Sequence, residues 1–285
     1  MPWQPATVSP APVTRFDRIH HLVTVPVRVG ERTARFVLDT GIGLTLLSEP
    51  LCTEIGCRPG GSTFTGRRMS GQEITVPLAT APALSIGGMT RRDHVVGIIA
   101  LDGFPPEFGP VDGFLSLAFF DEVPFTVDYA RGTVIVESRA SADERARTGS
   151  AVAVRLERDG PAVDAFMQLD LPGERTVEVE IDMGSDSLIL DERLAEPAGV
   201  DLRRDVVRRV EDHDETGHAY TRFFTQLAGS IHATGAPSVT QTDPEVMFQR
   251  IIYDGLVGDA FLRRFTMTYD LSRERVVFGQ GEATV

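Results

Sequence analysis

The chain has 285 residues, 42% hydrophobic and 24% charged, which is typical of a soluble globular protein with room for two ordinary cores. Its 28 basic and 41 acidic residues give a formal net charge of −13, which repels nucleic-acid backbones and anionic membranes. No apolar run approaches the length of a membrane span, and the N-terminus shows no signal-peptide pattern. We therefore expect a cytoplasmic protein that binds neither nucleic acid nor membrane.

Residues 1–18 are rich in proline and lack periodicity, which predicts a flexible or edge-strand lead-in, with order beginning near Ile19. Two β-branched runs follow at residues 21–29 and 33–38, separated by Gly30 and Glu31. They predict a hairpin whose second strand ends at Asp39.

After this hairpin, residues 44–47 continue as a strand, and Ser48 is a candidate N-cap for a short helix. The only two cysteines, Cys52 and Cys57, fall in this helical region. Because they are five residues apart, they cannot staple distant parts of the fold, and we expect them to be reduced and structural.

Further strands are predicted at residues 76–86 and 223–231, each after a glycine-containing polar turn. Two more hairpins are predicted at residues 125–136 and 265–278. Little helix remains, so the fold class is all-β. Residues 139–150 are small, polar and charged with nothing to bury, which predicts a linker.

One pattern occurs twice, as Phe36-Val-Leu-Asp39-Thr40-Gly41 and as Val179-Glu-Ile-Asp182-Met183-Gly184. The two aspartates are 182 − 39 = 143 residues apart, and residues 112–136 match residues 254–278 at an offset of 254 − 112 = 142. A period of this length is a small domain rather than a solenoid unit. The sequence therefore predicts two homologous lobes, residues 19–138 and 151–285, joined by the linker at 139–150.

Each of these aspartates ends a strand and precedes a glycine that lets the backbone pass close behind it. Two carboxyl groups that meet across a pseudo-twofold axis share one proton, because like charges about 3 Å apart do not both ionise at low cost. One carboxyl then acts as a general base on water while the other donates a proton. This chemistry suits peptide hydrolysis.

The segment from Phe36 to Ser48, repeated around Asp182 and paired with Asp254-Gly-Leu-Val-Gly258 and the residues after it, resembles aspartic peptidases of the retropepsin-like bacterial form with two repeats in one chain. The resemblance covers roughly residues 21–137 and 163–279. It implies two acid-protease β-barrel lobes related by a pseudo-twofold axis, with an active-site cleft between them. Asp39 and Asp182 would be catalytic, without a metal or organic cofactor. The supporting loops would contain Thr40, Gly41, Met183, Gly184 and Ser185.

Three residues depart from the family pattern. Met183 stands where the family has a hydroxyl residue that bonds across the lobe interface, and a thioether cannot donate that bond. Ile42 leaves Asp39 without the side-chain donor that Ser185 can supply to Asp182, and Ser116 replaces the glycine found at Gly258. Because a donor favours the ionised form, we expect Asp182 to ionise more readily and Asp39 to carry the proton more often.

Two turns are candidates for flaps that bind substrate: Met69, Ser70 and Gly71 in the first lobe, and Gly217, His218 and Tyr220 in the second. The acidic segment at residues 211–218 could alternatively bind a metal. However, two histidines on a turn are too few for a closed site, so no metal is predicted.

We therefore expect a monomeric aspartic endopeptidase that acts on an extended peptide or protein, since one chain supplies both halves of the site. No pro-segment is evident, which suggests narrow specificity, such as processing of one precursor. Two alternatives stay open. The aspartates could be ordinary turn residues, or the three departures could mark a catalytically degenerate protein that binds peptides.

Overall fold

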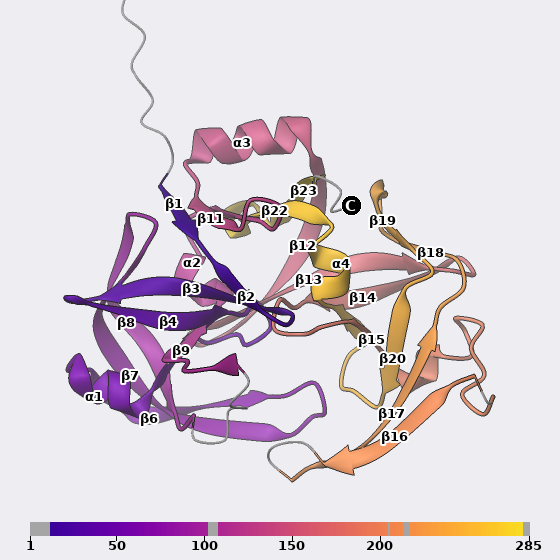
Figure 1. Ribbon diagram of the computed structural model, residues 1–285, viewed down its shortest axis with the longest axis horizontal. Coiled ribbons are helices and arrows are strands. Elements are labelled where there is room, and N and C mark those ends of the chain that lie inside the picture. The colour runs from indigo at the N-terminus through magenta and orange to yellow at the C-terminus, as the bar shows by residue number, and fades with distance from the viewer. Residues whose placement is uncertain (1–11, 102–107, 205, 214–216, 282–285) are drawn as a thin grey trace, which may run out of the picture.

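The computed structural model describes residues 12–101, 108–204, 206–213 and 217–281, and strands predominate in it (Figure 1). The described strands form two sheets, one of 15 strands and one of 8. None of the described helices is long and apolar enough to cross a membrane. The predicted all-β fold class is confirmed.

The N-terminal half, residues 12–136, contains these elements: β1 (Val13–Arg15), β2 (Asp17–Ile19), β3 (Leu22–Val29), β4 (Arg32–Leu38), β5 (Leu46–Ser48), α1 (Glu49–Glu54), β6 (Arg58–Arg67), β7 (Glu73–Ile86), β8 (Met89–Ile99), β9 (Gly113–Leu115), α2 (Leu117–Phe120), β10 (Phe125–Asp128) and β11 (Thr133–Val136). The helix α3 (Arg139–Thr148) follows.

The C-terminal half, residues 150–281, contains these elements: β12 (Ser150–Asp159), β13 (Ala162–Leu171), β14 (Arg175–Ile181), β15 (Leu188–Asp191), the 3₁₀ helix η2 (Glu192–Leu194), β16 (Arg208–His213), β17 (Ala219–Gln226), β18 (Ser230–Ala233), β19 (Ala236–Thr242), β20 (Glu245–Gln249), β21 (Gly255–Val257), α4 (Asp259–Leu262), β22 (Phe265–Asp270), the 3₁₀ helix η3 (Leu271–Arg273) and β23 (Arg275–Gln280).

The same strand pairing occurs in both halves. In the N-terminal half β9 is parallel to β4 and antiparallel to β5, and in the C-terminal half β21 is parallel to β14 and antiparallel to β15. Matched glycines begin β9 and β21. A Cβ on Gly255 would lie 2.5 Å from the Ile189 carbonyl oxygen, and a Cβ on Gly113 would clash with the Leu46 carbonyl oxygen in the same way. Close backbone approach therefore accounts for both glycines.

The two halves join through β10 and β22, which pair antiparallel. Thr126 lies opposite Thr268 in this pairing, and their hydroxyl oxygens are 2.7 Å apart in the buried interior. Beside them the ring of Phe125 stacks between Phe120 and Tyr269, at centroid distances of 4.0 and 4.8 Å. All three rings are fully buried, so aromatic packing reinforces the shared sheet.

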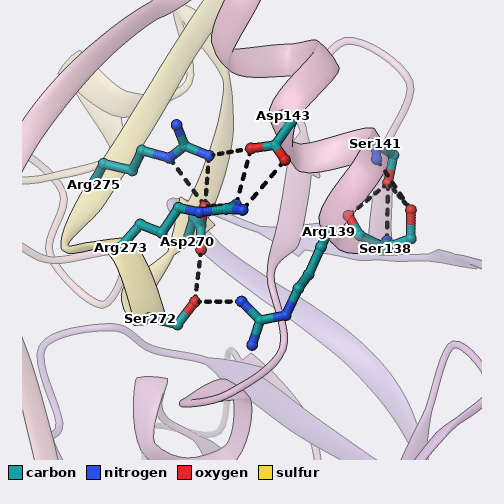
Figure 2. A network of polar contacts seen from close by, with 8 residues as sticks. All are labelled: Ser138, Arg139, Ser141, Asp143, Asp270, Ser272, Arg273 and Arg275. Atoms are coloured by element: carbon teal, nitrogen blue, oxygen red, sulfur yellow. Dashed lines mark hydrogen bonds and ion pairs between the residues drawn. The ribbon is translucent and has the colours of Figure 1, made fainter.

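The predicted linker is a helix. Ser138 and Ser141 form a capping box at the start of α3, and Ala142 is fully buried, so the expectation of a segment with nothing to bury was wrong. Asp143 on α3 accepts hydrogen bonds from Arg273 and Arg275, which both also bind the buried Asp270 (Figure 2). Ion pairs with residues far away in sequence therefore hold the helix against the β22–β23 hairpin.

Two further expectations need correction. Residues 1–11 of the predicted lead-in lie outside the described residues, but β1 and β2 show that order begins before Ile19, and β1 forms an edge strand on β11. Cys52 and Cys57 form a disulfide, so the prediction of reduced thiols was wrong. The turn after α1 brings them together, because the Cys57 N–H donates to the Cys52 carbonyl at 2.9 Å. Ser48 caps α1 as predicted.

Candidate active site

Asp39 and Asp182 lie at matched positions, directly after β4 and β14. The Asp39 N–H donates to the Leu115 carbonyl on β9, and the Asp182 N–H donates to the Val257 carbonyl on β21, both at 3.0 Å. Each aspartate is therefore fixed by the parallel neighbour of its own strand. The apolar, alternating sequences of β4 and β14 bury their core faces and leave the aspartates at the strand ends.

The two aspartate loops face each other closely. A Cβ added to Gly41 would lie 2.6 Å from the carboxyl carbon of Asp182, and a Cβ added to Gly184 would lie 2.6 Å from the carboxyl carbon of Asp39. Each carboxyl thus packs against the glycine of the opposite loop. The N–H groups of Gly41 and Gly184 also donate to Asp39 and Asp182 of their own loops, at 3.0 and 2.7 Å.

Thr40 bridges the two loops. Its buried hydroxyl donates to the Ile181 carbonyl at 2.6 Å and accepts from the Met183 N–H at 2.9 Å. Met183 is fully buried, and its thioether has no hydrogen to return the bond to the N-terminal loop. The hydroxyl bridge across the interface therefore runs from the N-terminal loop alone.

Both carboxyls hold their protons more firmly than a free aspartate does. Burial raises the pKa of Asp39 well above its usual value, and the nearby Asp182 raises it further. Burial also raises the pKa of Asp182, but hydrogen bonds from the Gly184 N–H and the Ser185 side chain oppose this rise. The difference agrees with the direction inferred from the sequence, with the proton mainly on Asp39.

Two of the three departures from the family pattern are accommodated locally. Ser116 is buried and its hydroxyl lies 3.1 Å from that of Thr45. Gly258 occupies the matched position in the C-terminal half. A glycine is required there, because a Cβ on Gly258 would lie 2.6 Å from the Ser185 carbonyl oxygen. Ile42 packs against an apolar cluster that includes Leu44 and Val76 of the N-terminal half and Ala162 of the C-terminal half.

The first predicted flap is the turn between β6 and β7, and it reaches the C-terminal half. The Met69 carbonyl accepts from the Ile252 N–H at 3.0 Å, and a Cβ on Gly71 would lie 2.9 Å from the Ile252 side chain. Met69 packs on the C-terminal apolar cluster, which we define as Ile189, Phe224, Met247, Ile251, Tyr253 and Leu256. In Figure 1 this hairpin extends across the molecule toward the end of β20.

The second predicted flap lies at β16 and β17, which pair antiparallel. Residues 214–216, between these strands in sequence, lie outside the described part of the chain. Gly217 adopts a φ of 81°, which suits a turn glycine. A pocket of about 490 Å³ brings both flaps together. It is lined by Ser70, Glu192, His218, Ala219, Tyr220, Thr221, Gln249, Arg250, Ile251 and Ile252. From the sequence, metal binding by residues 211–218 was an alternative. Within the described residues, no group of three or more potential metal ligands is present.

Sequence reasoning missed four side chains near the aspartates. The His21 Nε2 lies 3.2 Å from the Gly184 carbonyl, and the Tyr253 hydroxyl donates to Glu180 at 2.8 Å. Asp164 lies against Gly43, where an added Cβ would be 3.0 Å from its carboxylate. The one available signal was Glu180 itself, an acidic residue in an otherwise apolar strand end two positions before Asp182.

An all-β fold with an Asp-Thr-Gly loop at a strand end defines the class of aspartyl proteases. Comparison with protein families agrees, because residues 25–119 match the family model described as aspartyl protease. The chain therefore carries an aspartyl protease domain, and the matched span runs from β3 to α2, including Asp39, Thr40 and Gly41. A separate comparison with curated proteins found no match.

Proposed function

We propose that the protein is an aspartic endopeptidase that holds an extended polypeptide in a cleft between two lobes related by a pseudo-twofold axis. A water activated by Asp39 and Asp182 would hydrolyse the peptide bond. The observation that carries this proposal is the reciprocal contact of each carboxyl with the opposite glycine, since it places two carboxyls from matched loops at one point. Ordinary turn aspartates would have no reason to meet there.

The donors around each carboxyl and the direction of the pKa shifts support an assignment of roles within this proposal. Asp182, with the additional donor from Ser185, is the ionised member and removes a proton from water as the oxygen attacks the carbonyl carbon. Asp39 carries the shared proton and donates it to the carbonyl oxygen. When the tetrahedral intermediate collapses, the C–N bond breaks and the proton held by Asp182 passes to the leaving amine. As the carbonyl re-forms, Asp39 takes a proton back from one hydroxyl of the intermediate. The dyad thereby returns to its starting state.

The flaps and apolar clusters supply the binding surface in this proposal. The first flap, with Met69 to Gly71, and the second, with His218 and Tyr220, border one pocket, and the C-terminal apolar cluster lies beneath the first. Polar and charged side chains, including Glu192, Gln249 and Arg250, line this pocket beside the apolar cluster, and such a mixed surface would select among peptides, which supports processing of a particular precursor. Because both aspartates belong to one chain, we propose that the active form is a monomer.

One observation favours a second function. The buried Met183 removes the hydroxyl that would bind the N-terminal loop, so a peptide-binding protein without activity is the alternative. It predicts that peptides bind and remain intact. The retained bridge through Thr40, which holds both loops with two hydrogen bonds, supports the enzyme instead.

The test is cleavage of a diverse peptide library by the wild type, Asp39→Asn and Asp182→Asn between pH 4 and 7.5, read by mass spectrometry. We expect cuts by the wild type that disappear in both variants, by at least about 10³-fold. Folded wild type that binds library peptides without cutting them would transfer the proposal to the peptide-binding function.

We also propose a cytoplasmic location. The disulfide between Cys52 and Cys57 is evidence against it, because disulfides persist mainly in oxidising compartments. Thiol labelling in rapidly quenched cells tests it. A fully reduced pair supports the cytoplasm, and a fully oxidised pair supports an extracytoplasmic compartment.

A further inference from the structure

One face of the C-terminal sheet differs in charge from its counterpart in the N-terminal half. Phe166 on β13 lies opposite Glu180 on β14, whereas Thr24 lies opposite Val37 in the matched pair of β3 and β4. Alternation along β14 places Glu180 on the same side as Asp182, since Val179 and Ile181 face the core. A carboxyl therefore stands beside Asp182 where a buried valine stands beside Asp39.

Glu180 is 5% exposed, and the Tyr253 hydroxyl donates to its Oε2 at 2.8 Å. Tyr253 in turn packs edge-on against Phe166, with ring centroids 5.9 Å apart. The Tyr253 hydroxyl thus fixes the position of the Glu180 side chain, which forms no ion pair in the part of the chain that the structure describes. Burial raises the pKa of Glu180 well above its usual value, and the nearby Asp182 raises it further.

Asp164 on β13 adds a second carboxyl. It packs against Gly43 of the N-terminal loop, where an added Cβ would lie 3.0 and 3.2 Å from its two oxygens. Burial, together with the nearby Glu157, Asp182 and Asp159, raises the pKa of Asp164 to about 7.

The other charged and titratable groups around these carboxyls are already engaged. Arg155 stacks on Phe166 but binds Glu178 and Glu157. His21 contacts the Gly184 carbonyl and acts favourably on Asp182, and the buried Tyr269 lies near Thr40. Within the described residues, no arginine or histidine forms an ion pair with Asp39, Asp164, Glu180 or Asp182.

We propose that Glu180 and Asp164 are positioning residues that keep the proton shared by Asp39 and Asp182 in place, so that cleavage persists at neutral pH. The proposal rests on the proposed peptidase function and deepens it. As the pH rises, the aspartate pair loses its shared proton, and cleavage then stops. Loss of that proton leaves a second negative charge beside Glu180 and Asp164, which form no ion pair among the described residues, and repulsion between buried like charges opposes this.

The test compares Glu180→Gln, Asp164→Asn and the double variant with the wild type. Gln keeps the acceptor for Tyr253, and both changes preserve shape while removing a charge. Glu245→Gln on β20 is the matched control, because Glu245 is exposed on the same half of the molecule. Two readouts are needed: the pH dependence of kcat/KM, and carbon-13 NMR titration of Asp-labelled protein, which follows Asp39 and Asp182 without cleavage. Thermal unfolding verifies that each variant is folded.

We expect each single variant to move the alkaline limb of the pH–rate profile to lower pH by about one unit. The upper titration of the aspartate pair should move by the same amount. The double variant should move both further. The acidic limb stays in place, because Glu180 and Asp164 are protonated there. Wild-type cleavage with unmoved titrations in the folded variants would overturn this inference and leave the peptidase standing. Shifted titrations without any cleavage would support the proton-holding role and sink the proposed function.

Discussion

The two halves of the molecule have the same strand pairing around their aspartates but different chemistry at matched positions. The N-terminal loop supplies the hydroxyl bridge through Thr40, while the C-terminal loop supplies the Ser185 donor and lies beside Glu180. Matched strand pairing therefore need not carry matched side chains. In the proposed site, each supporting role is needed from only one half.

The largest effect should come from the feature the halves share. Gly41→Ala and Gly184→Ala would each displace the opposite carboxyl, and we expect both to lower kcat/KM by at least about 100-fold. Gly279→Ala is the control, because a Cβ there meets nothing closer than the Thr266 carbonyl at 3.5 Å. Full activity in one glycine variant alone would contradict the reciprocal arrangement of the loops.

The terminal hairpins offer a comparison in stability. Asp128 and Asp270 are matched and both buried, but Asp128 binds the exposed Arg131, whereas Asp270 binds Arg273 and Arg275. We expect Asp270→Asn to lower the free energy of unfolding by about 3 kcal/mol and Asp128→Asn by about 1 kcal/mol, measured by urea unfolding. Equal losses would show that the α3 contacts add nothing.

The Asp270 difference should also depend on pH. Burial alone would raise the pKa of Asp270, but hydrogen bonds from Arg273, Arg275 and Ser272 outweigh it and leave the pKa lowered. Its contribution is therefore complete above the unfolded pKa of about 3.9 and disappears as the pH falls through the lower folded value. The gap between the wild type and Asp270→Asn should close below about pH 4.

Thr40→Val tests the bridge that only the N-terminal loop provides. It leaves the Met183 N–H and the Ile181 carbonyl without their buried partner, so we expect a loss of about 2 kcal/mol in the free energy of unfolding. Met183→Leu preserves volume and should cost less than about 1.5 kcal/mol. If Met183→Leu lowered the free energy of unfolding more than Thr40→Val, packing of Met183 would contribute more to the contact between the loops than the Thr40 hydrogen bonds do.

The smallest effect concerns the asymmetry of the aspartate pair. Removing the Ser185 donor lets the pKa of Asp182 rise, so Ser185→Ala should move the acidic limb of the pH–rate profile to higher pH by about half a unit. Ile42→Ser would supply a donor to Asp39 at the matched position and weaken the preference for the proton there. An unmoved acidic limb in Ser185→Ala would remove the basis for assigning Asp182 as the base.

The sequence predicted the features that are local or duplicated: the all-β class, the strand before each aspartate, the Ser48 cap and both terminal hairpins. It did not predict α3, because the capping box of that helix is local but its ion pairs join residues about 130 positions apart. The bond between Glu180 and Tyr253 spans 73 residues for the same reason. Contacts between residues far apart in the sequence produce no periodic pattern, so they could not be predicted from the sequence.

The pairing of β10 with β22 has a consequence for each half taken alone. Thr126 and Thr268 are matched residues that face each other, so two strands with matched positions form the junction. If the chain were cut after Val136, β10 would become an open edge whose natural partner is another β10. The shared sheet thus gives each half the neighbour that a second copy of the same strand would supply in a dimer.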